Sequence, residues 1–144
     1  MEGVPKRPCF NVAFLGIVSF GTSSNQRRDK VHGFGLTIEE LKPRVIRIAL
    51  RGELDLAHAY TFDEELRRVE EARPSCVVLD LRELAFLDSC GLARLLAARR
   101  RARRLGHRLV LVRGPKTIQR LFALSAVDEA FEIVNDVPGA LTTH

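Results

Sequence analysis

Three residues with chemically capable side chains stand together in the middle of the chain: Asp88, Ser89 and Cys90. They follow the apolar run LDLRELAFL at 79–87 and precede a leucine-rich stretch with helical spacing. Asp and Ser are favoured helix N-cap residues, because their side-chain oxygens accept hydrogen bonds from the free N–H groups of the first turn. A phosphate is also tolerated at such a position, because those N–H groups and the helix dipole favour anions. Two roles therefore remain for Ser89: a helix N-cap next to Asp88, which local physics favours, or a site of phosphorylation.

The spacing of these residues does not support catalysis. The Gly-x-Ser-x-Gly turn of serine hydrolases is absent, because Leu87 stands where the first glycine would be. None of the four histidines has an evident acidic partner nearby in the sequence. Cys90 could be a reactive thiol at a helix start, but no Cys-x5-Arg phosphatase loop follows it, and a small residue is also what a tight helix start requires. The stretch GPKT at 114–117 is not a Walker loop, because Pro115 separates the glycine from the lysine. We expect no enzymatic activity and no catalytic residue.

The cysteines and the apolar runs indicate the cellular compartment of the protein and whether it has disulfides, metal sites or membrane spans. The cysteines are Cys9, Cys76 and Cys90, an odd count without C-x-x-C spacing, which argues against a disulfide framework and a zinc site. No stretch reaches the roughly 18 apolar residues that a membrane span requires. We therefore expect a cytoplasmic protein with no metal, no cofactor and no membrane span.

An arginine-rich segment follows Asp88-Ser89-Cys90-Gly91, in a chain whose formal net charge is +5. Its six arginines are Arg94, Arg99, Arg100, Arg101, Arg103 and Arg104. They could form a nucleic-acid patch, or a solvated helix face whose cations lie near the negative end of the helix dipole. Interleaved aromatic residues, a helix-turn-helix pattern and zinc spacing are all missing from the sequence. We favour the solvated face and expect no specific binding of nucleic acid.

From Gly33 onward, strand and helix patterns alternate. The strand patterns cover 34–41, 44–52, 76–81, 108–112 and 131–134. The helix patterns run from an Asp55 cap to before Pro74, from the Asp-Ser joint to Gly106, and over 116–127. The first two strands can form an antiparallel hairpin across Lys42-Pro43, with the first at the edge of the sheet. The alternation predicts an α/β fold with a mixed, largely parallel sheet flanked by helices.

The first 32 residues have a different composition. A mostly apolar run at 10–20 follows Lys6 and Arg7, which is the outline of a short secretory signal, and a linker-like stretch follows it. The run could equally be an extra strand or a partner-binding tail, and the segment could also result from a start codon placed too far upstream. We expect a flexible extension at 1–32 and one domain at 33–144 with a short C-terminal tail.

The segment LDLRELAFLDSCGLARLL, with RGELDLAHA about thirty residues upstream, resembles the STAS domain, and within it the phosphorylatable bacterial anti-anti-sigma factors. The resemblance spans about 33–136 in motif and in element order. Ser89 matches the serine that is phosphorylated in that family, Asp88 its acidic neighbour, and Asp55 a second acidic position near the site. Gly91 and Leu92 match the helix start that meets the partner. Cys90 departs from the usual serine, threonine or alanine, but it is also small.

The resemblance implies a STAS-like fold and a switch between partners. The unphosphorylated protein would bind an anti-sigma factor with serine kinase activity through Asp55, Asp88 and the 90–92 segment, and a sigma factor would be released. Phosphorylation of Ser89 would end the interaction, and a serine phosphatase would reverse it. We expect a monomer or a weak dimer. Two alternatives stay open: a STAS regulatory subunit of a membrane transport system, and a nucleotide-binding STAS module.

Overall fold

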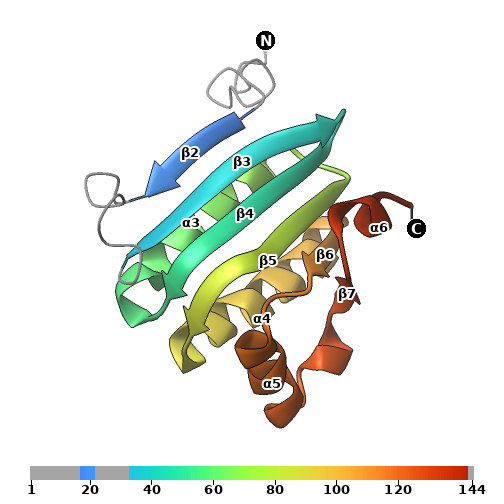
Figure 1. Cartoon of the computed structure of the whole chain (residues 1–144). Helices are drawn as coiled ribbons and strands as arrows, with labels where there is room; N and C mark the ends of the chain where they lie inside the picture. Colours follow the sequence, from blue (N-terminus) through green and yellow to red (C-terminus); the bar gives the residue numbers. More distant parts are fainter. Residues whose placement is uncertain (1–16, 22–32, 143–144) are drawn as a thin grey trace.

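A six-stranded mixed sheet forms the centre of the molecule. The computed structural model describes residues 17–21 and 33–142. The strands are β2 (Ile17–Gly21), β3 (Phe34–Lys42), β4 (Val45–Leu54), β5 (Cys76–Leu87), β6 (Arg108–Val112) and β7 (Glu132–Val134), and they lie in this order across the sheet. The pairs β2–β3 and β3–β4 are antiparallel, whereas β4 to β7 run parallel (Figure 1). The predicted fold class and the hairpin across Lys42-Pro43 are confirmed.

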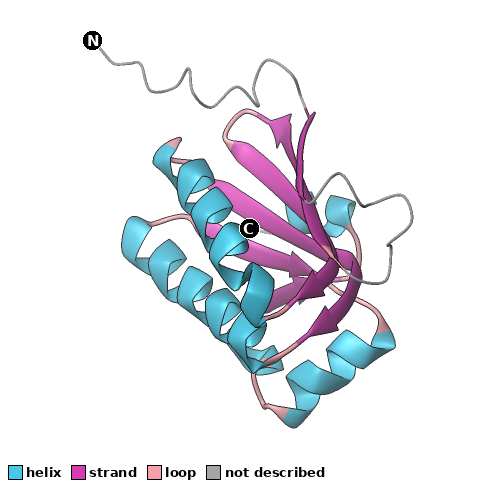
Figure 2. Cartoon of the chain, turned by 90° about the vertical axis from the view of Figure 1, so that its left-hand side faces the viewer, coloured by secondary structure: helices cyan, strands magenta, loops and turns pink. Residues whose placement is uncertain are grey.

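The helices cover the two faces of this sheet unequally. They are α3 (Leu56–Glu71), α4 (Ser89–Leu105), α5 (Lys116–Leu124), the 3-10 turn η2 (Asp128–Ala130) and α6 (Val137–Thr142). Figure 2 shows α3 and α4 side by side along one face of the sheet. Apolar residues of α3, α4 and α5 share the main core with that face, whereas α6 packs on a smaller cluster that includes Val78 and Val110.

The alternation of residues in β4 explains this division. Ile46, Ile48 and Leu50 are at most 3% exposed and join the main core, while the residues between them face the other way. Residues 76–81 of β5 are all buried, as expected for a central parallel strand that is covered on both faces. One face of the sheet therefore carries the main core, and α3 and α4 begin where β4 and β5 end.

The first predicted strand is not at the edge of the sheet. β2 pairs along β3, with Val18 opposite Ile38, so the sheet gains a strand that the hairpin pattern did not require. An extra strand was one of the alternatives for the run at 10–20. The signal and tail interpretations concern residues that lie mostly outside the described part, and the division into an extension and one domain stays a prediction.

The last part of the chain differs from expectation in two details. The third predicted helix ends at Leu124 and not at 127, because Ala126 adopts a left-handed backbone conformation (φ 57°) and the Val127 N–H closes on the Phe122 carbonyl. The expected tail contains α6, whose Ala140 is fully buried. In 17–21 and 33–142, no helix is both long enough and apolar enough to cross a membrane.

Candidate functional site

Two helix N-termini meet at the carboxyl ends of neighbouring strands. β4 ends at Leu54 and leads through Asp55 into α3, and β5 ends at Leu87 and leads through Asp88 into α4. Leu54 and Leu87 are register partners in the parallel pair. Because parallel strands end at the same edge of a sheet, the two helix starts and their acidic caps lie side by side.

The Asp88 carboxylate joins the two helix starts. Its Oδ1 atom accepts a hydrogen bond from the Gly91 N–H in α4 at 2.9 Å. Its Oδ2 atom accepts one from the Leu56 N–H at the start of α3, at 3.1 Å. One side chain therefore satisfies a free N–H group in each helix, groups that otherwise have no intrahelical partner.

Asp55 is the N-cap of α3, as the sequence predicted. Its Oδ1 atom accepts a hydrogen bond from the His58 N–H at 3.2 Å, and the Nδ1 atom of the same histidine lies 2.8 Å from that oxygen. The expectation that no histidine has an acidic partner nearby in the sequence is therefore wrong for His58. The His58 ring in turn stacks on Phe34, with ring centroids 5.6 Å apart. Asp55 is thus held by His58 of its own helix, and His58 is in turn held by the core residue Phe34.

The expectation that Ser89 caps α4 is wrong. Asp88 has the extended backbone of an N-cap (φ −104°, ψ −175°), and Ser89 is already the first helical residue. Ser89 is exposed, and its hydroxyl is not needed to close the helix. Adjacent Asp and Ser are equally good caps by type, so the sequence alone could not choose between them.

Gly91 and Leu92 set how closely α4 approaches the sheet. A Cβ atom on Gly91 would lie 2.3 Å from the Leu54 carbonyl oxygen and 2.7 Å from Leu87 Cδ1, so any side chain would push the helix away. Leu92 is only 9% exposed and packs in the main core. Gly91 and Leu92 therefore position the site from the core side. Cys90 is a partly exposed free thiol. Contact of Cys90, Gly91 and Leu92 with a partner stays a prediction.

Large apolar side chains lie exposed close to Asp55 and Asp88 along the chain, and none of them was among the predicted site residues. Leu56 is 73% exposed and Tyr60, one turn further along α3, is 66% exposed. Phe86, which precedes Asp88 by two residues, is 48% exposed. We call Leu56, Tyr60, Phe86 and Ser89 the docking face. A recognisable signal was Tyr60, an apolar residue outside the helical spacing of Ala59, Phe62 and Leu66. Leu56 shares that spacing, so the pattern places it with the core residues, and its exposure corrects this expectation.

The arginine-rich helix is not a uniformly solvated face. Arg101 is only 6% exposed, and it donates to Glu70 at 2.8 Å and to Asp63 at 3.3 Å, both on α3. Burial alone would raise the pKa of the Asp63 carboxyl, but the hydrogen bond from Arg67 and the charge of Arg101 outweigh it and hold that pKa below its usual value. Arg100, Arg103 and Arg104 are exposed as expected. The helix thus carries one arginine that holds α3 and α4 together, beside several that face solvent.

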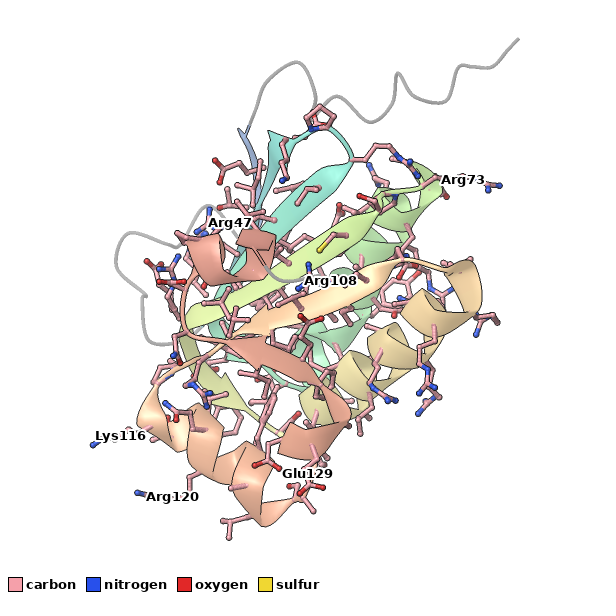
Figure 3. The ribbon with its side chains drawn as sticks, turned by 90° about the vertical axis from the view of Figure 1, so that its right-hand side faces the viewer. Arg47, Arg73, Arg108, Lys116, Arg120 and Glu129 are labelled. Carbon is pink, nitrogen blue, oxygen red and sulfur yellow. The ribbon has the colours of Figure 1, made fainter. Side chains whose placement is uncertain are left out.

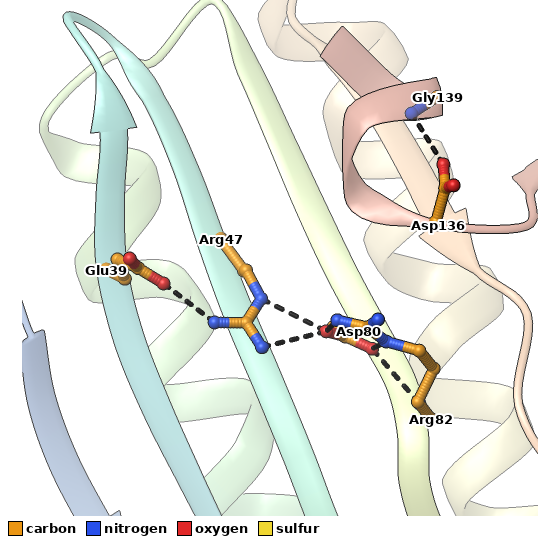
Figure 4. A network of polar contacts seen from close by, with 6 residues as sticks. All are labelled: Glu39, Arg47, Asp80, Arg82, Asp136 and Gly139. Carbon is orange, nitrogen blue, oxygen red and sulfur yellow. Dashed lines mark hydrogen bonds and ion pairs between the residues drawn. The ribbon is translucent and has the colours of Figure 1, made fainter.

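A second ionic network lies on the opposite face of the sheet (Figure 4). The Asp80 carboxylate accepts from Arg82 Nη2 at 2.7 Å and from Arg47 Nε at 3.0 Å, and Arg47 Nη1 also donates to Glu39 at 2.7 Å. These contacts tie β3, β4 and β5 together on the face that also carries the smaller apolar cluster with α6. The figure also shows Asp136 accepting from the Gly139 N–H at 2.8 Å, which closes the first turn of α6.

The chain resembles known proteins both in sequence and in fold. The model of the STAS domain family matches residues 38–140. The crystal structure of an anti-sigma factor antagonist from Mycobacterium paratuberculosis is similar, with a TM-score of 0.65 and 24% identity over 76% of this chain and 92% of that one. The anti-sigma factor antagonist SpoIIAA in its unphosphorylated form has a TM-score of 0.63 and 19% identity, over 74% of this chain and 92% of that one. The phosphorylated form of SpoIIAA, from Bacillus, has a TM-score of 0.59 and 19% identity, over 74% of this chain and 96% of that one.

The match to the family model includes both acidic caps, Ser89 and every parallel strand of the sheet. The order of strands and helices agrees with the fold of these solved structures. This chain therefore belongs to the STAS domain family.

Proposed function

We propose that this protein is an anti-sigma factor antagonist that is switched by phosphorylation of Ser89. Unphosphorylated, it binds an anti-sigma factor that is also a serine kinase, and a sigma factor is released. The kinase phosphorylates Ser89 and ends the interaction, and a serine phosphatase restores it. In this scheme the protein is a substrate and a binding partner, not an enzyme. The observation that carries the proposal is the exposed Ser89, which Asp88 frees from helix capping, while the same Asp88 accepts from the backbone of the exposed Leu56.

The position of Ser89 suits a phosphate that changes binding without unfolding the domain. At the first residue of α4, the phosphate would meet the positive end of the helix dipole and free backbone N–H groups. It would bring a charge of about −1.5 to −2 to the docking face, close to the Asp88 carboxylate. A partner that covers Leu56, Tyr60 and Phe86 would have to bury that charge. An unpaired buried charge costs several kcal/mol, which is about two or more decades of affinity.

Two substitutions at Ser89 test the switch. We expect Ser89→Ala to fold, to bind the anti-sigma kinase as tightly as the wild type, and to resist phosphorylation. Ser89→Asp should fold equally well and bind about a hundredfold more weakly, because a fixed negative charge enters the docking face. Calorimetric titration with the kinase measures the affinities, and mass spectrometry after incubation with kinase and ATP locates the phosphate.

Ser125→Asp is the matched control, because it places the same charge on an exposed serine at the end of α5. It should leave affinity unchanged. Phosphate found on another residue, or Ser89→Asp binding as tightly as the wild type, would contradict the proposed switch.

The two alternatives make different demands on the same residues. A regulatory subunit of a transport system would use the docking face but would not require a phosphorylatable serine. A nucleotide-binding module would place phosphate at the start of α4, where the Gly91 N–H already donates to Asp88. Normal binding by Ser89→Asp would favour the first alternative, and saturable nucleotide binding that is lost in Ser89→Asp would favour the second.

A further inference from the structure

A concave region lies at the opposite end of α4 from Ser89. It is a pocket of about 730 Å³ where α3 and α4 end and where the turn before β5 begins. Five arginines contribute to its lining: Arg44, Arg67, Arg73, Arg101 and Arg104. We call it the pole pocket. Since α4 has 17 residues, each with a rise of about 1.5 Å, the pocket lies about 25 Å from the docking face. Figure 3 shows Arg73 at one end of the molecule, and Lys116 and Arg120 of α5 at the other.

The pole pocket carries more positive charge than its own carboxylates balance. Arg101 is paired with Glu70 and Asp63, and Arg67 is paired with Asp63. The other three arginines have no carboxylate within ion-pair distance among the described residues; they are Arg44, Arg73 and Arg104. Glu70 and Glu71 are the acidic residues of the lining. Even when Asp63 is counted with Glu70 and Glu71, five arginines stand against three carboxylates, so the positive charge is in surplus.

Part of this cationic lining is held in place by the backbone. Arg44 Nε and Nη2 donate to the Arg73 carbonyl at 3.2 and 2.9 Å, which clamps the β3–β4 turn to the loop after α3. The Ser75 hydroxyl donates to the Arg44 carbonyl at 3.1 Å from the same loop. The clamp fixes the orientation of the Arg44 guanidinium before any ligand arrives, and a pre-organised site loses less entropy on binding.

Buried polar atoms in the wall of the pocket lack partners. Arg101 is 6% exposed, and its Nη2 atom has no hydrogen-bond partner among the described residues. The same holds for His107 Nε2 and for one oxygen of Glu70, Oε2. A buried donor without a partner is costly, and a charged one more so. The Arg101 Nη2 atom lies beneath the surface of the pocket, and Glu70 stays held by Arg101 Nε at 2.8 Å. An anionic group that entered the pocket would meet the exposed guanidinium groups of Arg73 and Arg104.

The shape and composition of the pole pocket favour a small ligand over nucleic acid. Phe, Tyr and Trp are missing from the described lining, and its one aromatic ring, the imidazole of His107, is partly buried, so bases would find a poor stacking platform. The volume falls within the range of about 300–1,000 Å³ that small-molecule sites occupy. We propose that the pole pocket binds a small polyanion, a molecule that carries two or more phosphate or carboxylate groups. This proposal is independent of the role of Ser89.

Inorganic tripolyphosphate and citrate are the probes, one for each kind of anion. We expect at least one of them to bind saturably, with amide NMR shifts concentrated at Ser75, Gly106 and His107. The double variant R73Q/R104Q should lose about tenfold or more in affinity, because two charged hydrogen-bond donors are removed. R100Q/R103Q is the matched control: it removes the same charge from exposed positions of α4 that do not line the pocket, and it should keep its affinity within about twofold.

Several outcomes would overturn the proposal. Neither probe binds, both double variants weaken binding equally, or the shifts spread over all exposed arginines; each of these results would leave general charge attraction as the explanation. Binding of duplex DNA without binding of either probe would identify a polyelectrolyte surface instead. Both variants change exposed side chains, and thermal melting verifies that they fold. Ser89→Asp should bind the probe like the wild type, so a failure here and a failure of the proposed switch are distinguishable.

Discussion

At the scale of single residues, the central feature is one carboxylate shared between two helices. Asp88 accepts from Gly91 in α4 and from Leu56 in α3, and it frees Ser89 from capping. The arrangement separates stability from switching, because the residue that holds the structure is next to the residue proposed to change it. It also places the Asp88 charge where a phosphate on Ser89 would be close to it.

We expect Asp88→Ala to lower the free energy of unfolding by about 2 kcal/mol, because two helix-start N–H groups lose their acceptor. Asp88→Asn keeps one of the two acceptor oxygens, so its loss should be about half as large. Ser89→Ala should cost less than about 0.5 kcal/mol, as an exposed residue without a capping role. Urea denaturation of the three variants measures these differences. If Ser89→Ala destabilised the protein as much as Asp88→Ala, the assignment of the cap would be wrong.

At the scale of elements, α3 and α4 are joined by charge as well as by apolar packing. Arg101 lies between Asp63 and Glu70 of α3, while neighbouring arginines of the same helix are exposed. The α3–α4 pair carries Leu56, Tyr60 and Ser89 of the docking face at one end and part of the pole pocket at the other. The alignment of the two helices therefore matters for both surfaces.

We expect Arg101→Met to destabilise the protein by about 3 kcal/mol, because it leaves Glu70 buried without its cation. Arg100→Met, on the exposed side of the same turn, should change stability by less than about 0.5 kcal/mol. Adding Glu70→Leu to Arg101→Met should restore part of the loss, since the buried carboxylate is then removed as well. Chemical denaturation measures all three, and a loss of similar size in both single variants would contradict a buried role for Arg101.

At the scale of the whole molecule, buried carboxylates make stability depend on pH. Burial alone would raise the pKa of the Asp80 carboxyl, but hydrogen bonds from Arg82 and Arg47 outweigh it and hold that pKa below its usual value. Asp63 is shifted in the same direction. The unfolded chain therefore takes up protons on these groups at a higher pH than the folded protein does. Their contribution to stability is present above about pH 4 and is lost as the pH falls through the lowered folded-state pKa.

The difference in unfolding free energy between neutral pH and about pH 3 tests this account. The wild type should lose stability over that range, and Asp80→Asn should lose less, because its amide does not titrate. Asp128→Asn, at an exposed position on η2, should show the same loss as the wild type. An equal loss in Asp80→Asn and in the wild type would mean that Asp80 contributes nothing to the pH dependence.

Much of the fold followed from rules that act over a few residues. The alternation in β4, the continuous apolar run that begins β5, the Asp55 cap and the Gly106 stop each depend on near neighbours in the chain. Together with the strand–helix order, they predicted the fold class. The motif around Ser89 led to the family.

Other features depended on partners that are far apart in sequence. The choice of Asp88 over Ser89 as the cap came with a second acceptor role toward Leu56, 32 residues away. The burial of Arg101 depends on Glu70, 31 residues away. β3 is internal only because β2 pairs with it. Capping, strand and helix patterns are satisfied locally, but which charge is buried and which apolar side chain stays exposed is decided when distant elements pack. The sequence by itself therefore determined the fold class and the Asp88-Ser89-Cys90 segment between a strand and a helix. The tertiary structure alone decided which residue is the cap and where the docking face and the pole pocket lie.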